Sequence, residues 1–403
     1  MANGLFLSLP LHGHTNPSLP LVRQLVTRGD QIVYYSTEPF AGSIERTGAR
    51  YHAYSNAFLA DMRQLPDRMD HLAWLLMRTT AEVLSRELDS LRAGGFHYII
   101  TDAVAPWGQW VGRLLSIPVV TSVTTFAINR HVAAFGLAHG VRPKSVRHVL
   151  SKVRSMMKAS RVRRQLCRRY GISGPGVMES VFGRSDLNIV YTSRYFQPCA
   201  ETFDDRFVFV GPSIAARADV EFPWDEVRSP RIVYGSMGTL FNADPKFARM
   251  CFEAFENDDV QVILSIGENA PEARTGEAPP NFIVRRFVPQ LDVLARASAF
   301  VTHGGMNSVS ESLYHGVPVV VIPQMGEQAI VGRRAEQLGA GLYLANDDVT
   351  PESLRASVQH LLGDSQFREQ AARVRESFHS AGGVERAVDA IIAFTREPSV
   401  ASL

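Results

Sequence analysis

The stretch from 287 to 328 constrains the fold of this chain more than any other. An apolar segment at 299–302 predicts a buried strand, and the motif His-Gly-Gly-Met-Asn-Ser follows directly at 303–308. A second apolar segment, 319–322, ends shortly before Glu327-Gln328. A strand, a glycine pair and a helix start in this order place free backbone N–H groups at the positive end of a helix dipole, where phosphate binds. Because open α/β sheets bind ligands at the carboxyl ends of their strands, the stretch predicts a nucleotide-diphosphate site beside polar sugar-binding residues.

The same alternation of strand and helix runs through both halves of the chain and predicts parallel sheets with right-handed crossovers. A chain of 403 residues is long enough for two domains of about 200 residues each. We therefore expect an α/β protein with two Rossmann-like domains. The expected strands lie at 5–9, 31–35, 97–101, 119–122, 188–191 and 207–210 in the first half, and at 231–234, 261–265, 282–284, 299–302 and 319–322 in the second.

The expected domain boundaries follow from this pattern. The first domain would cover 1–211 and the second 230–382. Between them, 212–229 mixes Pro, Ala and charged residues without periodicity, which is typical of a linker. A Gly-Gly pair then precedes a last amphipathic helix within 383–403.

The bulk composition excludes several classes of protein. Apolar residues make up 45% of the chain and charged residues 20%, and no apolar run approaches the roughly 20 residues that a membrane span requires. The N-terminus lacks the basic leader of a signal peptide. Cys167, Cys199 and Cys251 are odd in number, far apart and without metal-ligand spacing. We expect reduced thiols and a cytoplasmic protein.

The first strand–helix turn contains His12 and His14 where a dinucleotide site would have the glycines of G-x-G-x-x-G. This argues against an NAD or FAD site in the first half. Pro17 suits a helix start, and we expect the helix to begin there. Asp102 follows the third expected strand. Strands of one parallel sheet end on the same side, so His14 and Asp102 should lie close together if their strands are neighbours.

The segment 142–169 is strongly basic, with eleven Lys and Arg residues and no Asp or Glu. Its apolar residues keep roughly helical spacing. One interpretation is a solvated helix face. The other is attraction to an anionic acceptor or to a lipid headgroup layer. We do not expect nucleic-acid binding, because no aromatic stacking pattern accompanies the charge.

Several motifs together resemble the donor signature of family 1 glycosyltransferases, which are GT-B enzymes that use UDP-sugars. The likeness is closest to the bacterial macrolide and flavonoid glycosyltransferases. It spans nearly the whole chain and is weakest from about 55 to 180, where acceptors bind in that family. The matching segments are 287–290, 303–308, Glu311, 316–318 and Glu327-Gln328 in the second half, and 13–17, 201–207 and 209–212 in the first.

The resemblance implies two Rossmann-like domains that face each other across a cleft, with the C-terminal helix crossing back to the first domain. It also implies roles for individual residues. Phe287 would stack on uracil, Glu311 would hold the ribose, and Glu327 and Gln328 would hold the sugar hydroxyls. Many members have Asp where Glu327 stands. The implied donor-binding residues are Ser236, Gly238, Thr239, Phe287, Val288, Gln290, His303, Gly305, Asn307, Ser308, Glu311, Glu327 and Gln328.

The implied reaction is an inverting transfer of a sugar, with glucose expected, from a UDP-sugar to a hydroxyl of a small lipophilic natural product such as a macrolide or flavonoid. His14 would be the general base, and Asp102 would fix its tautomer. His303 and helix-terminal N–H groups would neutralise the leaving diphosphate. The chain has no Asp-x-Asp motif, so we expect neither a metal nor a cofactor. A monomer or weak homodimer is expected.

Other interpretations of the same residues remain open at this level. His14 could be a turn histidine and Asp102 a helix cap, and Ser308 and Glu311 have the spacing of a capping box. Two alternative functions are a membrane-associated lipid glycosyltransferase that uses the basic segment, and a catalytically silent GT-B protein that activates a partner. The pairing of His14 with Asp102 disfavours a third, a sugar-nucleotide epimerase.

Overall fold

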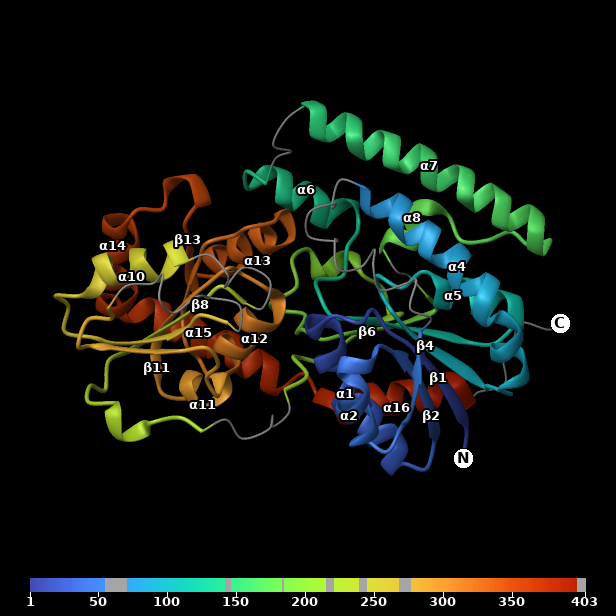
Figure 1. Cartoon of the computed structure of the whole chain (residues 1–403), viewed down its shortest axis with the longest axis horizontal. Coiled ribbons are helices and arrows are strands. Elements are labelled where there is room, and N and C mark those ends of the chain that lie inside the picture. The colour runs from blue at the N-terminus through green and yellow to red at the C-terminus, as the bar shows by residue number, and fades with distance from the viewer. Residues whose placement is uncertain are drawn as a thin grey trace.

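The computed structural model describes residues 1–54, 71–141, 146–182, 185–214, 221–238, 245–267 and 277–396. Within these residues the chain forms two lobes, each built on a parallel β-sheet that is covered by helices (Figure 1). Two Rossmann-like lobes of the α/β class are thus confirmed. The domain boundaries at 211, 230 and 382 stay a prediction.

The first lobe contains seven described strands in the order β3-β2-β1-β4-β5-β6-β7. Because strand side chains alternate between faces, Leu5 and Leu7 pack with α4 and α5, whereas Phe6 packs on the opposite face with α1 and α16. Both faces are therefore buried, as expected for a parallel sheet. The strands are β1 (Asn3–Leu7), β2 (Gln31–Ser36), β3 (Arg50–Ala53), β4 (Tyr98–Asp102), β5 (Val119–Val123), β6 (Leu187–Val190) and β7 (Phe207–Phe209).

The helices of the first lobe connect these strands in chain order. They are α1 (His12–Thr27), η1 (Glu38–Phe40), α2 (Ala41–Glu45), α4 (Leu72–Ala93), α5 (Trp107–Leu115), α6 (Arg130–Ala138), α7 (Val146–Tyr170), α8 (Val177–Phe182) and η3 (Ala200–Thr202).

The second lobe contains six described strands in the order β10-β9-β8-β11-β12-β13. The strands are β8 (Ile232–Ser236), β9 (Gln261–Ser265), β10 (Phe282–Arg285), β11 (Ala297–Thr302), β12 (Val319–Val321) and β13 (Gly341–Tyr343). The helices are η4 (Trp224–Glu226), α10 (Pro245–Phe255), α11 (Gln290–Leu294), α12 (Met306–Tyr314), α13 (Gly326–Gln337), η6 (Asn346–Asp348), α14 (Pro351–Gly363) and α15 (Ser365–His379).

The last helix, α16 (Gly383–Arg396), follows the second lobe in sequence but packs against α1 of the first (Figure 1). Its buried residues Ala387, Val388 and Ile391 join the core beneath that sheet. At its end Arg396 donates to the buried carboxylate of Asp30 at 3.1 Å. Within the expected linker, the described residues 221–229 pack on the second lobe through Phe222 and Trp224.

Three elements differ from the sequence-based expectation. Helix α1 begins at His12 and not at Pro17, so Pro17 and Pro20 lie inside the helix. A proline can follow the first turn when the carbonyl that it leaves without an N–H partner is bonded elsewhere. The strands β3 and β13 were not expected, because they are short and lie at the edges of their sheets, where the apolar pattern is weak.

Candidate active site

The first part of the candidate site lies where α1 leaves β1. Leu11 has an extended backbone and precedes the helix, and the N–H of His14 donates to the carbonyl of Leu11 at 2.9 Å. His14 is therefore held in the first turn of α1, at the carboxyl end of the sheet. A free turn histidine is excluded by this placement.

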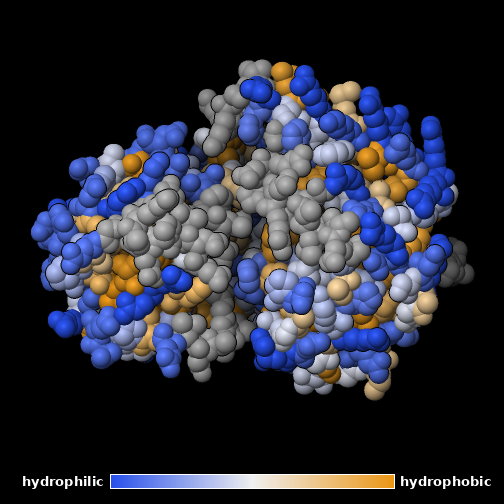
Figure 2. Space-filling view, in the orientation of Figure 1, coloured by the Kyte–Doolittle hydropathy of each residue, from blue (hydrophilic) through white to orange (hydrophobic). Residues whose placement is uncertain are grey.

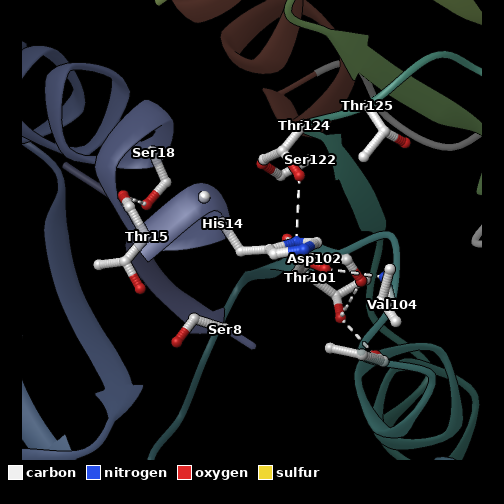
Figure 3. Close-up of polar contacts among 12 residues, drawn as sticks. Ser8, His14, Thr15, Ser18, Thr101, Asp102, Val104, Ser122, Thr124 and Thr125 are labelled. Atoms are coloured by element: carbon white, nitrogen blue, oxygen red, sulfur yellow. Dashed lines mark hydrogen bonds and ion pairs between the residues drawn. The ribbon is translucent and has the colours of Figure 1, made fainter. Parts of the chain in front are cut away.

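Asp102 is the last residue of β4, which pairs directly with β1. Since neighbouring parallel strands end side by side, the two residues meet. Nδ1 of His14 lies 2.8 Å from Oδ2 of Asp102, as Figure 3 shows. The expected proximity of His14 and Asp102 is present in the structure.

The two oxygens of Asp102 have different partners. Oδ1 accepts from the N–H of Val104 at 2.8 Å. This is a local turn bond and not the helix cap of the alternative interpretation, because α5 begins at Trp107 with Pro106 as its N-cap. Oδ2 faces the imidazole. The carboxylate is only 2% exposed, so these contacts hold it in one position.

Thr124 is a second contact of the imidazole and was not anticipated. Its hydroxyl lies 3.0 Å from Nδ1 of His14 (Figure 3). Thr124 follows β5, the next strand after β4, so the rule that strand ends converge would have identified it. With Nδ1 facing a carboxylate and a hydroxyl, we assign the ring proton to Nδ1, which leaves the lone pair of Nε2 for a substrate.

The pKa of His14 is raised above 6.5 by a balance of opposing causes. Burial is the largest and lowers the pKa. The negative charge of Asp102, its hydrogen bond and the charge of Glu327 raise the pKa and together outweigh burial. Asp102 therefore both orients the ring and raises its pKa, and the ring must be deprotonated to act as a general base.

Glu327 belongs to the second lobe, on the first turn of α13, yet it acts electrostatically on His14. Its side chain is solvent-accessible but crowded by protein, and this limited hydration raises the pKa of the carboxyl. His14 lowers that pKa and Asp102 raises it, so the three groups titrate in one electrostatic environment. The two lobes therefore share one site.

A hydrogen bond also joins the lobes beside His14. Nδ2 of Asn307, on α12, donates to the backbone carbonyl of Gly13 at 3.0 Å. In an α-helix that carbonyl would accept from residue 17, but Pro17 has no N–H. The proline inside α1 thus frees an acceptor that the second lobe uses.

His303 follows β11 and is packed between two glycines. A Cβ at Gly238 would lie 2.5 Å from Cε1 of His303, and a Cβ at Gly305 would lie 2.5 Å from Nε2. Burial lowers the pKa of His303 to about 4, so the ring is neutral near pH 7. A neutral ring would contact a diphosphate through its N–H, and the role of His303 in donor binding stays a prediction.

Helix α12 begins at Met306 with Gly305 as its N-cap, so Ser308 and Glu311 do not form the capping box that their spacing allowed. Backbone N–H groups of the first turn have no partner within a helix, and they lie beside His303. Ser236 ends the neighbouring strand β8. These groups together form a surface suited to an anion.

Glu311 is only 5% exposed and accepts from Nε2 of Gln290 at 2.5 Å. Oε1 of Gln290 in turn accepts from the hydroxyl of Tyr234 at 3.0 Å. Near this network Val288 packs against the core, but the Phe287 side chain is 51% exposed. An exposed aromatic ring next to an acidic network is a suitable surface for a nucleoside.

Gln328 has a local structural role. Its Oε1 accepts from the N–H groups of Gln324 and Met325 at 2.8 and 3.1 Å, which closes the start of α13. A contact with a sugar would therefore come from its amide N–H₂. Thr239 lies outside the described residues.

Three further features concern the described part of the chain. A cavity of about 560 Å³ between α6, α8 and 202–207 contains none of the predicted site residues. Across the described ranges, no cluster of three His, Cys, Asp or Glu side chains is arranged to hold a metal ion. The described helices include none with the length and apolar content needed to cross a membrane.

Comparison with known proteins gives consistent matches. Residues 249–393 match the family model of the erythromycin biosynthesis protein CIII-like C-terminal domain. The NDP-glycosyltransferase YjiC of Bacillus subtilis (strain 168) is 33% identical over 397 residues, covering 98% of this chain and 97% of the relative. The demethyllactenocin mycarosyltransferase of Streptomyces fradiae is 33% identical, covering 97% and 86%. The crystal structure of CalG4, the calicheamicin glycosyltransferase, matches with a TM-score of 0.83 and 30% identity over 99% of both chains.

Two Rossmann-like lobes that share one site define the GT-B fold, and the full-length matches are glycosyltransferases. The chain belongs to the family 1 UDP-glycosyltransferases and resembles the macrolide glycosyltransferases among them.

Proposed function

We propose that this glycosyltransferase transfers glucose from UDP-glucose to a hydroxyl group of a small lipophilic natural product, with inversion at the anomeric carbon. The observation that carries the proposal is the 2.8 Å contact between His14 and Asp102. It lies at the edge of the acceptor lobe that faces Glu327 and Asn307 of the other lobe. A base on one lobe and an anion site on the other are the two groups that a single displacement needs.

In the proposed mechanism Nε2 of His14 accepts the proton of the acceptor hydroxyl. The acceptor oxygen forms a bond to the anomeric carbon while the bond from that carbon to the UDP oxygen breaks. Asp102 stabilises the imidazolium that results, and it remains ionised. Because attack and departure occur on opposite faces, an α-linked donor gives a β-glycoside.

The second lobe would stabilise the leaving UDP. The first-turn N–H groups of α12 and the neutral N–H of His303 would donate to the diphosphate. Phe287 would stack on uracil, and Glu311, positioned by Gln290, would accept from the ribose hydroxyls. Glu327, next to His14, would hold the sugar at the reacting carbon. Ser236, Gly238 and Ser308 complete the proposed donor site.

The expected location of this reaction is the cytoplasm, and the expected acceptor is a small molecule.

The test is to incubate the protein with UDP-α-glucose and a panel of phenols and macrolides, and to determine the anomeric configuration of the product by NMR. A β-linked glucoside with release of one UDP per product supports the proposal. An α-linked product excludes a single displacement, and transfer from TDP-sugars alone excludes UDP-glucose as the donor.

A further inference from the structure

Helix α7 is a 25-residue helix at the outer edge of the first lobe, and it packs along α4 (Figure 1). One face is buried against the lobe through Ser155, Ala159 and Leu166. At 1.5 Å per residue the helix is about 37 Å long. Its exposed side is a long ridge that also lines an open hollow of about 570 Å³, to which Val149, Val153 and Met157 contribute.

The outward face of this ridge is apolar in the first half of the helix. Val149, Val153 and Met157 follow one another at intervals of four residues, and Leu150 lies beside them. Their exposed fractions are 43%, 51%, 57% and 51% respectively. Residues four apart lie on one helix face, so these four side chains form a continuous stripe. An exposed apolar stripe of this kind marks an interaction surface.

Basic residues surround the stripe. Helix α7 contains nine Lys and Arg residues and no Asp or Glu. Because the formal net charge of the whole chain is +2, the residues outside α7 together carry −7. Among the described ion pairs none involves a cation of α7. The upper right edge in Figure 2 shows blue side chains with orange patches among them.

The charge decides between possible occupants of this surface. A second copy of the chain would place two strongly positive helices against each other, which is repulsive. A nucleic acid would meet an aliphatic stripe with no aromatic side chains for stacking. A basic helix with one apolar face fits a lipid surface, where the apolar side chains enter the headgroup layer and Lys and Arg reach the phosphates.

We propose that α7 docks the acceptor lobe on an anionic lipid bilayer. Val149, Leu150, Val153 and Met157 insert below the headgroups, and the flanking cations bind the lipid phosphates. The inference concerns where the protein works and does not depend on which sugar or acceptor it uses. Each Lys or Arg near an anionic surface contributes about fivefold in membrane partitioning.

The experiment is sedimentation of the full chain with vesicles of phosphatidylcholine containing phosphatidylglycerol, compared with pure phosphatidylcholine. The chain should bind the anionic vesicles in 50 mM salt and be released in 500 mM salt. Replacing Arg161→Gln and Arg164→Gln together should weaken partitioning roughly 25-fold. Replacing Val153→Ser and Met157→Ser together should also weaken it, at unchanged charge.

The matched control replaces two exposed arginines of α15, Arg368→Gln and Arg373→Gln, and should leave partitioning unchanged. All variants change exposed side chains, so they should fold normally by circular dichroism. The proposal is overturned if the chain fails to bind anionic vesicles in low salt, or if the control weakens binding as much as the α7 variants. Binding to an acidic polypeptide without vesicle binding would also overturn it.

Discussion

The surroundings of His14, the proposed base, act on its pKa in opposite directions. Burial lowers the pKa, and the carboxylates of Asp102 and Glu327 raise it above 6.5. The hydrogen bond from Nδ1 to Asp102 also leaves the lone pair of Nε2 for a substrate. A single residue, Asp102, thus sets both the orientation of the ring and much of its proton affinity.

The Asp102→Asn variant tests this at the residue scale. Because the neutral imidazole is the active form, kcat/KM should rise with pH through the pKa of His14, above 6.5 in the native protein. Removing the charge of Asp102 leaves burial to dominate, so the acid limb should move to lower pH. The maximal rate should also fall, by up to the roughly 10²–10⁴-fold that general-base catalysis typically contributes.

The measurement is kcat/KM from pH 5 to 9. A matched control is Asp30→Asn, which changes another buried carboxylate of the same lobe, one that binds Tyr98 and Arg396 far from His14. The control should lower stability without moving the acid limb. An unchanged limb in Asp102→Asn would show that Asp102 does not set the pKa of His14.

The turns after β8 and β11 meet around one imidazole, His303. Gly238 has a φ of +73° and Gly305 has no side chain, so both backbones approach the ring closely. This close packing fixes the position of His303 beside the start of α12. The approach of His303 requires glycine at both positions, and the positive φ of Gly238 is a second reason for glycine there.

The Gly238→Ala variant should weaken UDP binding, because the added Cβ would lie 2.5 Å from His303 and displace the ring. Overpacking of this kind costs about 1–3 kcal/mol, which corresponds to roughly 5- to 150-fold in Kd. Gly29→Ala is the matched control. Gly29 has a φ of +94°, and a Cβ added there would meet no atom within 4 Å. It carries the backbone strain without the collision and should bind UDP normally. Equal UDP affinity in the two variants, measured by calorimetry, would contradict this account.

The elements also show how far the sequence alone leads. The apolar runs predicted β1 and β4, and the convergence of strand ends then predicted the contact between His14 and Asp102. The start of α1 was mispredicted, because the bond from Asn307 to the Gly13 carbonyl comes from a residue almost 300 positions away. Gln328 differs for a local reason, because its Oε1 accepts from the N–H groups of Gln324 and Met325 at the start of α13. Local pattern predicts elements, whereas side-chain partners depend on the packing of distant segments.

The whole molecule places its chemistry between two lobes. Besides the bond from Asn307 to Gly13, Arg334 donates to the carbonyl of Phe196 at 3.0 Å, and the hydroxyls of Ser193 and Ser377 lie 2.8 Å apart. Helix α16 returns to the first lobe and packs on α1, the helix that carries His14. The position of the base relative to the donor lobe therefore depends on several separate contacts.

The central claim is that the first lobe supplies the base and the second lobe binds the donor, and one pair of measurements separates these roles. In His14→Ala, kcat should fall by about 10²–10⁴-fold, while the Kd for UDP measured by calorimetry should stay near that of the native protein. The matched control is His12→Ala, because His12 lies in the same helix turn as His14 but packs against Phe40. This variant should keep nearly full turnover. Near-normal turnover in His14→Ala would contradict the account.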